Sequence, residues 1–323
     1  MYCTKIQLAL RKLKNVECLS LNPIALIKTL YTNLAIKSSI NFTYPPLTLK
    51  NYVWKIIIGR SLRMRLPKST PKESYPRVLL VCSYRPDEPN LIEALIKSIK
   101  EARSTKIDLV LNNYGNFPAS PVELPFVKYT MRKPKFQNVP EMIKNEFRPC
   151  HDYVMIIDDD VLLPKQFFDE YFNIVKWLGL KLSQPALTRD SFWDHPCTLQ
   201  ISGEIAHLTS FVEIGPVTCF SKEMVEILPF EDCSPMGYGL DLVWSRLCRD
   251  RRWSMGVIDC TLVRHRLRPI AKAYDTRNEI ALMKKYLSGK PHVPIIATEI
   301  VGQIFWQEEL PLHSLMCLMQ DSN

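Results

Sequence analysis

Three consecutive carboxylates, Asp158-Asp159-Asp160, follow directly on the apolar run 153–157. Adjacent carboxylates repel one another, and a bound divalent cation relieves that repulsion. If strand geometry continues past the apolar run, Asp158 and Asp160 point to the same side, because side chains in a strand alternate with a period of two. Their hard oxygen atoms suit Mg²⁺ or Mn²⁺, so the pattern predicts a metal site. The alternative is a solvated acidic turn ahead of the next helix.

The surrounding sequence supplies the elements that would position these carboxylates. Apolar runs at 78–82, 107–111 and 153–157 have the length and composition of buried parallel strands, and a weaker run covers 126–130. Amphipathic helical stretches separate the runs. We therefore expect an α/β domain with a mostly parallel sheet flanked by helices. In open sheets of this class ligands bind at the carboxyl ends of the strands, which is where the acidic triplet falls.

Local signals predict where two of the helices begin and end. Asn138-Val-Pro-Glu141 has the residue types of a capping box, so a helix is expected to begin with Asn138 as its N-cap. Pro164 is expected to start the following helix and Gly179 to end it. The apolar face of this second helix is expected to comprise Phe168, Tyr171, Phe172 and Val175.

Composition and charge limit the classes of protein to which this chain can belong. With 46% hydrophobic residues in 323, the chain can bury a large core, which excludes general disorder. Residues 1–75 hold 13 Lys or Arg and two acidic residues, whereas the whole chain has 42 and 33, so the excess positive charge lies in this quarter. A basic extension before a near-neutral domain favours an anionic membrane surface. Nucleic acid is a disfavoured partner, because no known nucleic-acid module accompanies the charge.

Prolines at 67, 71 and 76 predict a linker between a basic extension (1–75) and the α/β domain, which we expect to span 76–290 and to be followed by a tail (291–323). The run 55–65 interleaves apolar and cationic residues, as a helix on a membrane surface or a helix lying on the domain would. No transmembrane helix is expected. The ten cysteines include no C-x-x-C pair, which indicates reduced thiols and a cytoplasmic protein. The basic N-terminal segment predicts a peripheral contact with the inner face of a membrane.

The order of motifs resembles the nucleotide-sugar glycosyltransferases of the GT-A fold, and in particular a glycosyltransferase-like family of unknown function best represented in plants. The resemblance covers about residues 76–268. It is carried by the D-x-D motif after an apolar strand, with two strand–helix units before it. The downstream motifs, in order, are 182–187, 211–217, Phe220-Ser221, Gly237-Tyr-Gly-Leu-Asp241, 256–259 and His265.

The resemblance implies a transfer of a sugar from a nucleoside diphosphate, most simply a UDP-sugar, to a hydroxyl group of a glycan or lipid-linked acceptor, with Mn²⁺ or Mg²⁺ as cofactor. Asp158 and Asp160 would hold the metal that bridges the donor diphosphate, and His265 would complete the metal shell. Arg264 and Arg266 would contact phosphate oxygens. The alternative for His265 is a surface residue in a basic loop.

The nucleotide is expected over the carboxyl ends of the first strands. Ser83, Tyr84 and Arg85 follow the first strand and offer a ring for the base and a cation for phosphate. Asn113 ends the second strand, where related enzymes often have an acid for the base or ribose. Asn138 could contact the nucleotide, although a capping role explains it equally well.

An acid near the acceptor is the expected general base. Asp241 occupies that place in the resemblance, at the start of a helix whose N-terminus would keep the carboxylate ionised at neutral pH. A simple cap is the alternative, and Leu240 replaces the first of two acids that many relatives carry. Glu213 is the rival base. Three further side chains would shape the acceptor site or pack in the core: Trp193, His195 and Tyr238.

Two other functions use the same residues. A nucleotidyl- or phosphotransferase could also work with an Asp-bound metal, although the absence of G-x-x-x-x-G-K-[ST] from the sequence excludes P-loop chemistry. A catalytically inactive chain could serve as a nucleotide-sugar-binding module.

Overall fold

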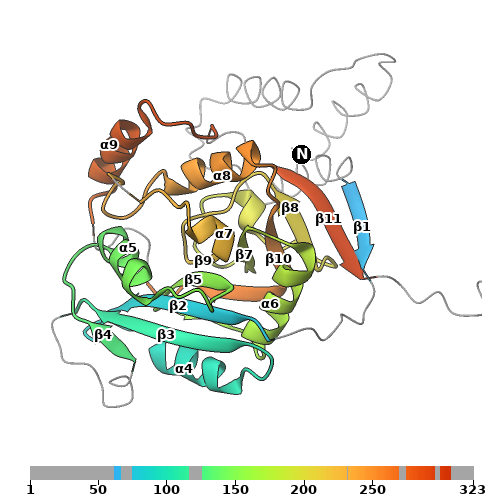
Figure 1. The fold of residues 1–323 in the computed structure, drawn as a ribbon, viewed down its shortest axis with the longest axis horizontal. Coiled ribbons are helices and arrows are strands. Elements are labelled where there is room, and N and C mark those ends of the chain that lie inside the picture. Colours follow the sequence, from blue (N-terminus) through green and yellow to red (C-terminus); the bar gives the residue numbers. More distant parts are fainter. Residues whose placement is uncertain are drawn as a thin grey trace, which may run out of the picture. The chain divides into compact units, whose positions relative to one another are not determined.

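The computed structural model describes residues 62–66, 75–115, 126–230, 232–268, 274–294 and 299–306, which all belong to one unit, Ser61–Asn323 (Figure 1). The strands are β1 Leu62–Leu66, β2 Arg77–Tyr84, β3 Lys106–Asn113, β4 Val127–Tyr129, β5 Tyr153–Asp158, β6 Val161–Leu162, β7 Leu182–Leu187, β8 Ala206–Thr209, β9 Val217–Ser221, β10 Met255–His265 and β11 Ile300–Trp306. The helices are α4 Ile92–Glu101, α5 Lys135–Glu146, α6 Phe167–Leu178, α7 Lys222–Val225, α8 Leu240–Asp250 and α9 Thr276–Leu287, with a short 3₁₀ turn, η1, at Pro196–Thr198.

The strands form one sheet in the order β1-β11-β8-β10-β7-β9-β5-β2-β3-β4, and β6 pairs with the end of β10. Strands β5, β2, β3 and β4 are parallel, as the sequence predicts for this part of the chain. Strand β9 lies between β5 and β7 and is antiparallel to both, so β5 and β7 run in the same direction. The predicted α/β class is therefore confirmed, and the carboxyl ends of β2, β3, β5 and β7 meet at one edge of the sheet.

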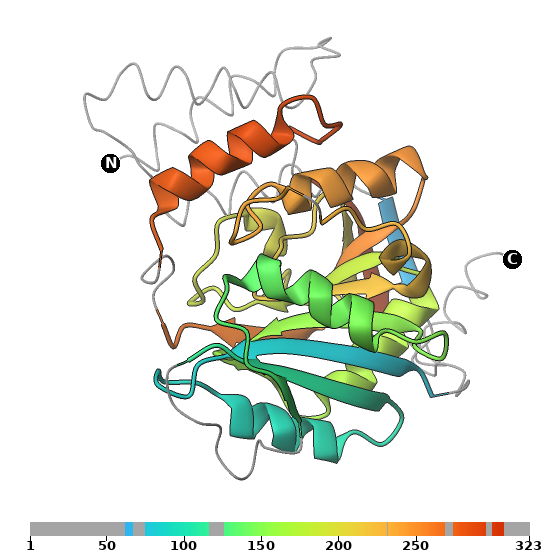
Figure 2. The same cartoon turned by 60° about the vertical axis from the view of Figure 1, so that its left-hand side comes forward.

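Alternation along the central strands divides the core between the two faces of the sheet. In β2, Val78, Leu80 and Cys82 pack with α4 and α6 on one face, whereas Leu79 and Val81 pack with α5 and α8 on the other. Figure 2 shows α5 and α4 on opposite sides of this part of the sheet. Because both faces are covered, the central strands are apolar throughout, which is why they were recognisable in the sequence.

Helix α5 begins before Asn138, so the predicted N-cap is wrong. The N-cap is Pro134, and Asn138 lies inside the helix, fully buried, with its side-chain amide donating to the carbonyl oxygen of Lys133 at 2.6 Å. Pro140 falls within the helix and cannot donate to the carbonyl of Phe136, which accepts instead from the Cys233 thiol at 3.9 Å. Asn138 therefore binds the loop before the helix through its side-chain amide and does not cap the helix start.

Helix α6 starts at Phe167, with Gln166 as its N-cap, rather than at Pro164. Its predicted apolar face, Phe168, Tyr171, Phe172 and Val175, is buried, and Gly179 ends the helix at φ +61° as expected. A positive φ favours glycine because a Cβ atom would clash with the backbone there. This helix covers the face of the sheet that carries Met155 and Ile157.

The sheet extends beyond the predicted domain limits of 76 and 290 at both ends. Strand β1 comes from the predicted basic extension and β11 from the predicted tail, and the two pair in parallel. The end of the run 55–65 is therefore a strand rather than part of a surface helix, and the rest of that run lies outside the described residues.

Across the described part of the chain, none of the helices combines the length and the apolar character needed to cross a bilayer. The seven cysteines there are free thiols.

Candidate functional site

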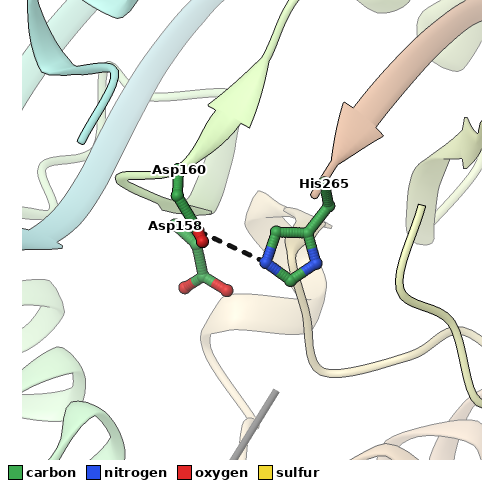
Figure 3. Close-up of side chains that lie close together, drawn as sticks. All are labelled: Asp158, Asp160 and His265. Carbon is green, nitrogen blue, oxygen red and sulfur yellow. Dashed lines mark ion pairs between the residues drawn. The ribbon is translucent and has the colours of Figure 1, made fainter. Parts of the chain in front are cut away.

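Two strand ends bring Asp160 and His265 together. The chain turns after β5 into the short strand β6, which runs antiparallel to the end of β10 with Val161 opposite His265. This register places Asp160, the residue before Val161, beside the imidazole, with 3.3 Å between Asp160 Oδ1 and His265 Nε2 (Figure 3). Asp158 completes the group, because one ligand atom from each of the three residues lies within 4.8 Å of the others. The predicted convergence of these three residues is confirmed.

Asp158 is held by a lysine and lies beside a serine. Its Oδ1 atom accepts a hydrogen bond from Lys135 Nζ at 2.6 Å, at the start of α5. In the parallel pair β2–β5, Ser83 is the residue opposite Asp158. The Ser83 hydroxyl is buried and has no hydrogen-bond partner among the described residues. A ligand bound next to Asp158 would therefore find both a cation and an unused hydroxyl group.

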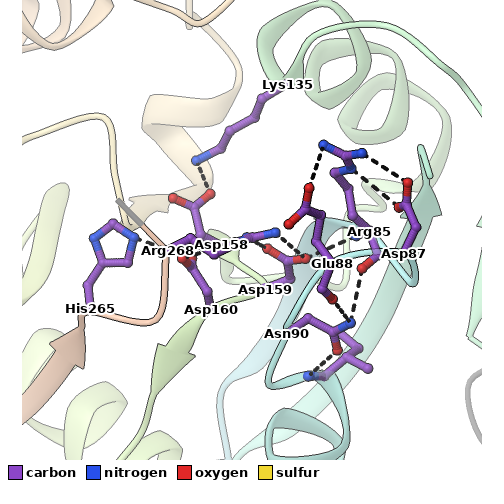
Figure 4. A network of polar contacts seen from close by, with 11 residues as sticks. Arg85, Asp87, Glu88, Asn90, Lys135, Asp158, Asp159, Asp160, His265 and Arg268 are labelled. Atoms are coloured by element: carbon purple, nitrogen blue, oxygen red, sulfur yellow. Dashed lines mark hydrogen bonds and ion pairs between the residues drawn. The ribbon is translucent and has the colours of Figure 1, made fainter. Parts of the chain in front are cut away.

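The middle carboxylate, Asp159, faces away from this group and organises the cation-rich side of the site. It accepts the backbone N–H of Arg85 at 3.0 Å and forms an ion pair with the guanidinium group of Arg268. Arg268 also donates to Asp160 Oδ2 at 3.3 Å, so one arginine ties the second and third aspartates together (Figure 4). Burial alone would raise the pKa of Asp160, but His265 and Arg268 outweigh it and lower the pKa to about 2.

These side chains lie in a cavity of about 1000 Å³. The residues of the acidic triplet, His265 and Arg268 all line it, together with Ser83 and Arg85 from the end of β2. The remaining lining includes basic, acidic and aromatic side chains: Tyr114, Arg132, Lys133, Lys135, Phe192, Asp194, His195, Glu213, Tyr238, Asp241, Tyr274 and Glu279. A metal-binding group of residues and a cleft large enough for a substrate therefore share one place in the fold.

Asp241 is a buried acid in the wall of this cavity. It lies in the first turn of α8, is 8% exposed, and accepts the backbone N–H of Leu242 at 2.9 Å. Burial raises its pKa to about 7, although hydrogen bonds from backbone N–H groups, including that of Ile214, act in the opposite direction. The backbone N–H groups of the helix start stabilise the carboxylate as expected, but the desolvation cost exceeds this stabilisation, so that Asp241 is only partly ionised at neutral pH.

Glu213 lies near Asp241 in the same wall. Its backbone N–H donates to Gln184 Oε1 on β7 at 2.7 Å, and its own Oε2 atom is buried with no hydrogen-bond partner among the described residues. Burial raises the pKa of Glu213 well above its usual range, and the carboxylates of Asp194 and Asp241 add to the effect. Both predicted base candidates are thus in the cavity, and both favour the protonated form more than an ordinary acid does.

Arg264 and Arg266 are not part of the cavity lining. Both are about half exposed and form ion pairs with Asp190, at 2.5 Å and 3.2 Å. The arginine that reaches the cavity is Arg268, beyond the end of β10. The partner carboxylate, Asp190, comes from a distant segment, so the local sequence does not reveal that Arg264 and Arg266 are paired outside the cavity.

Tyr84 and Asn113 also lie outside the cavity lining. Tyr84 shares the face of Val78 and Leu80 in the core and is fully buried, so its ring cannot stack on a nucleotide base. Asn113 is 6% exposed, and its side-chain oxygen accepts the N–H of Gly115 at 3.0 Å. The ring that does line the cavity is Tyr114, with the guanidinium carbon of Arg85 5.7 Å from its centroid.

Of the three side chains expected to shape an acceptor site, His195 and Tyr238 line the cavity and Trp193 packs against the core. Burial lowers the pKa of His195, which favours its neutral form. Tyr238 Oη lies 3.2 Å from Tyr274 Oη. Lys135 and Tyr274 were missed by the sequence analysis; the only local signal for Lys135 is its place in a basic run before a helix.

A second group of potential metal ligands, Glu204, His207 and Asp259, is buried elsewhere in the sheet. Both imidazole nitrogens of His207 are already engaged, by Asp259 Oδ2 at 2.7 Å and by the carbonyl oxygen of Cys197 at 2.8 Å. Neither nitrogen is therefore left for a metal, and His207 joins β8 to β10 and to η1 through these two hydrogen bonds.

Comparison with known proteins identifies solved structures of similar fold. No family model matches the sequence. No curated protein matches it either. Among solved structures, a mannosyltransferase from Pyrobaculum calidifontis, solved with GDP-mannose and Mn²⁺, superposes with a TM-score of 0.52 at 14% identity, over 77% of this chain and 73% of that one. Glucosyl-3-phosphoglycerate synthase from Mycobacterium tuberculosis gives a TM-score of 0.48 at 14% identity, over 75% and 98% of the two chains.

The likeness to the mannosyltransferase confirms the predicted fold, a mostly parallel sheet flanked by helices as in GT-A glycosyltransferases, into which antiparallel strands such as β9 are inserted. The predicted kinship with the plant family stays a prediction, since no family model matches.

Proposed function

We propose that this protein is a metal-dependent glycosyltransferase that moves a sugar from a nucleoside diphosphate to a hydroxyl group of an acceptor. The observation that carries the proposal is the convergence of Asp158, Asp160 and His265 on one wall of a substrate-sized cavity. The mannosyltransferase of similar fold, which was solved with GDP-mannose and Mn²⁺, supports the class of donor and of cofactor.

The residues present fit a divalent cation. Two carboxylate oxygens and one imidazole nitrogen lie within 4.8 Å of one another, and this donor set suits Mn²⁺ or Mg²⁺ with further positions left for phosphate oxygens and water. Asp158, Asp160 and His265 would hold the ion. When bound, it would offset the negative charge that builds on the diphosphate as the sugar departs.

Cationic and polar side chains around this group fit the rest of the donor. Arg268 and Lys135 lie against the aspartates and can each turn a donor group toward phosphate oxygens. Tyr114 and Ser83 lie toward β2 and β3, where a nucleoside would have a ring to stack on and a free hydroxyl to bond. We therefore assign the phosphate contacts to Arg268 and Lys135 rather than to Arg264 and Arg266.

Asp241 is the proposed general base. The acceptor hydroxyl oxygen forms a bond to the anomeric carbon of the sugar, the bond from that carbon to the diphosphate oxygen breaks with its electron pair going to the diphosphate, and the hydroxyl proton passes to the carboxylate of Asp241. A pKa of about 7 suits this role, because a base works best when its pKa lies near the working pH. A direct displacement of this kind inverts the anomeric carbon.

The acceptor is proposed to be a glycan or a lipid-linked compound at the cytoplasmic face of a membrane. This part of the proposal is motivated by the basic residues before β1, which lie outside the described residues.

The decisive experiment measures donor hydrolysis and metal binding in the full chain. Wild type is expected to release nucleoside diphosphate from a UDP- or GDP-sugar with Mn²⁺, and Asp158→Ala/Asp160→Ala is expected to lose both turnover and Mn²⁺ binding by calorimetry. Asp250→Ala is the control, because Asp250 is an exposed acid on α8 that pairs with Arg246. Full activity in the double variant would refute the proposal.

Product analysis separates the alternatives. Transfer of a nucleotidyl or phosphoryl group in place of a sugar would identify a nucleotidyl- or phosphotransferase. Nucleotide-sugar binding without turnover, whatever acceptor is offered, would identify a binding module.

A further inference from the structure

The wall of the cavity on the β7 side carries three acids, Asp194, Glu213 and Asp241. Glu213 is attached to β7 through the hydrogen bond from its N–H to Gln184, and Asp241 is attached to the same loop through the N–H of Ile214. Among the described residues, no lysine or arginine forms an ion pair with any of the three acids. Because burial favours the protonated form of Glu213 and Asp241, this wall presents carboxyl groups to a ligand but no lysine or arginine paired with them.

Three cations of the cavity lining, Arg85, Arg132 and Lys133, lie on the opposite flank, whereas Lys135 and Arg268 lie between the flanks and pair with the acidic triplet. Arg85 follows β2, and the loop that carries Arg132 and Lys133 is attached to the end of β3 by hydrogen bonds of 2.8 Å and 3.1 Å between Met131 and Asn112. In the sheet, β3 lies two places from β5 on one side and β7 two places from β5 on the other. The metal-binding residues at the end of β5 thus lie between a basic flank and an acidic flank.

This division between the two flanks indicates where the donor and the acceptor bind. A nucleoside diphosphate carries negative charge, so it fits the basic flank over β2 and β3, and the acceptor is left with the acidic flank over β7. An anionic group on the acceptor would face the carboxylate of Asp194, and the nearest cations, Lys135 and Arg268, are already paired with the acidic triplet. An uncharged hydroxyl group meets no such penalty, and the buried Oε2 atom of Glu213 has no hydrogen-bond partner among the described residues to compete for it.

We infer that the acceptor is an uncharged, hydroxyl-rich compound with no anionic group near the attacking hydroxyl, and that Glu213 selects it by a hydrogen bond to a second hydroxyl. The inference rests on the proposed function and narrows its acceptor class. The raised pKa of Glu213 supports it, because a protonated carboxyl can donate to a hydroxyl oxygen as well as accept.

The test compares matched acceptors that differ by one charge. Wild type, Mn²⁺ and a nucleotide sugar that it hydrolyses are mixed with equal high concentrations of glycerol and glycerol 3-phosphate, and then of methyl glucoside and methyl glucuronide. The neutral member of each pair is expected to receive at least about ten times more sugar, a preference of about 1.4 kcal/mol. Equal or better transfer to the anionic members, or hydrolysis with no transfer to a neutral member, would overturn the inference and leave the proposed function standing.

A charge reversal provides the second test. Asp194 is exposed and its replacement leaves the core intact, so Asp194→Lys is expected to shift the product ratio toward the anionic acceptors by about tenfold. Glu101→Lys is the matched control, because Glu101 is an exposed acid at the end of α4, outside the cavity lining. An unchanged ratio in Asp194→Lys, or the same shift in both variants, would contradict the inference.

The role of Glu213 is tested by a pair of variants. Glu213→Ala is expected to raise KM for the neutral acceptor more than it lowers kcat, and Glu213→Gln is expected to restore KM, because an amide can still donate to a hydroxyl oxygen. Equal KM values in Glu213→Ala and wild type would remove Glu213 from the selection. A chain that hydrolyses no nucleotide sugar would overturn the proposed function and this inference together.

Discussion

The buried position of Asp241 makes the stability of the protein depend on pH in a direction that can be measured. Its pKa is about 7 in the folded chain, against an ordinary value of 3.8. An acid with a raised pKa binds its proton more tightly in the folded state, so the contribution of Asp241 to the free energy of unfolding is largest below about pH 4 and falls as the pH rises toward 7. Between about pH 5 and about pH 7 the fall is about 1.4 kcal/mol per pH unit, or about 3 kcal/mol in total.

Asp241→Asn removes the ionisation while keeping the size of the side chain. Relative to wild type, its free energy of unfolding is expected to be about 3 kcal/mol more favourable at about pH 8 than at about pH 5. Urea unfolding of both full-length proteins, followed by tryptophan fluorescence at the two pH values, measures this difference. The comparison between pH values cancels any constant cost of losing a hydrogen bond to the Leu242 N–H.

Asp190→Asn is the control. A hydrogen bond from Thr188 and the guanidinium groups of Arg264 and Arg266 lower the pKa of Asp190 to about 2. A lowered pKa stabilises the folded state above the ordinary value and loses that effect only as the pH falls toward 2, so the Asp190→Asn difference should be the same at both pH values. If Asp241→Asn behaved like this control, Asp241 would have an ordinary pKa, and the argument for it as a base near neutral pH would fail.

Two further predictions concern the walls of the cavity. Arg268→Lys is expected to weaken binding of UDP with Mn²⁺ about tenfold in calorimetry, because lysine lacks the planar guanidinium group that can bind two phosphate oxygens. Arg264→Lys is expected to bind as wild type does, and equal losses in the two variants would mean that both arginines contact the phosphates. Gly237→Ala is expected to lower the free energy of unfolding by at least about 2 kcal/mol, because φ is +82° and a Cβ atom would lie 2.4 Å from the Phe136 ring; wild-type stability would mean that the loop before α8 lies elsewhere.

The metal-binding part of the site could be predicted because its signals are local. The carboxylates follow an apolar strand, and strand alternation places Asp158 and Asp160 on one side. The same alternation, counted from Val78, would have placed Tyr84 in the core, where the structure has it. The position of Tyr84 at the end of the strand predicts a place near the nucleotide, but alternation decides the direction of its side chain.

Other features depended on partners that are distant in the sequence. Arg264 and Arg266 are drawn away from the cavity by Asp190, which precedes them by a long stretch of chain. The start of α5 is fixed by the loop that Asn138 binds, and no local rule distinguishes that amide from a cap. The raised pKa of Asp241 reflects its burial in the folded chain, which the local sequence around it does not reveal.

The pairing of β1 with β11 has a consequence for how the sheet is completed. Leu62 lies opposite Gly302, so the outermost strand comes from the beginning of the unit and its neighbour from the end. Bringing β1 and β11 together closes a loop of nearly the whole unit, which costs conformational entropy. We expect the pairing to offset this cost only when β8 already lies beside β11. In the centre of the sheet, β2 pairs with β5 (Val78 opposite Tyr153) across a much shorter stretch of chain, whereas this edge can form only after nearly the entire unit has been synthesised.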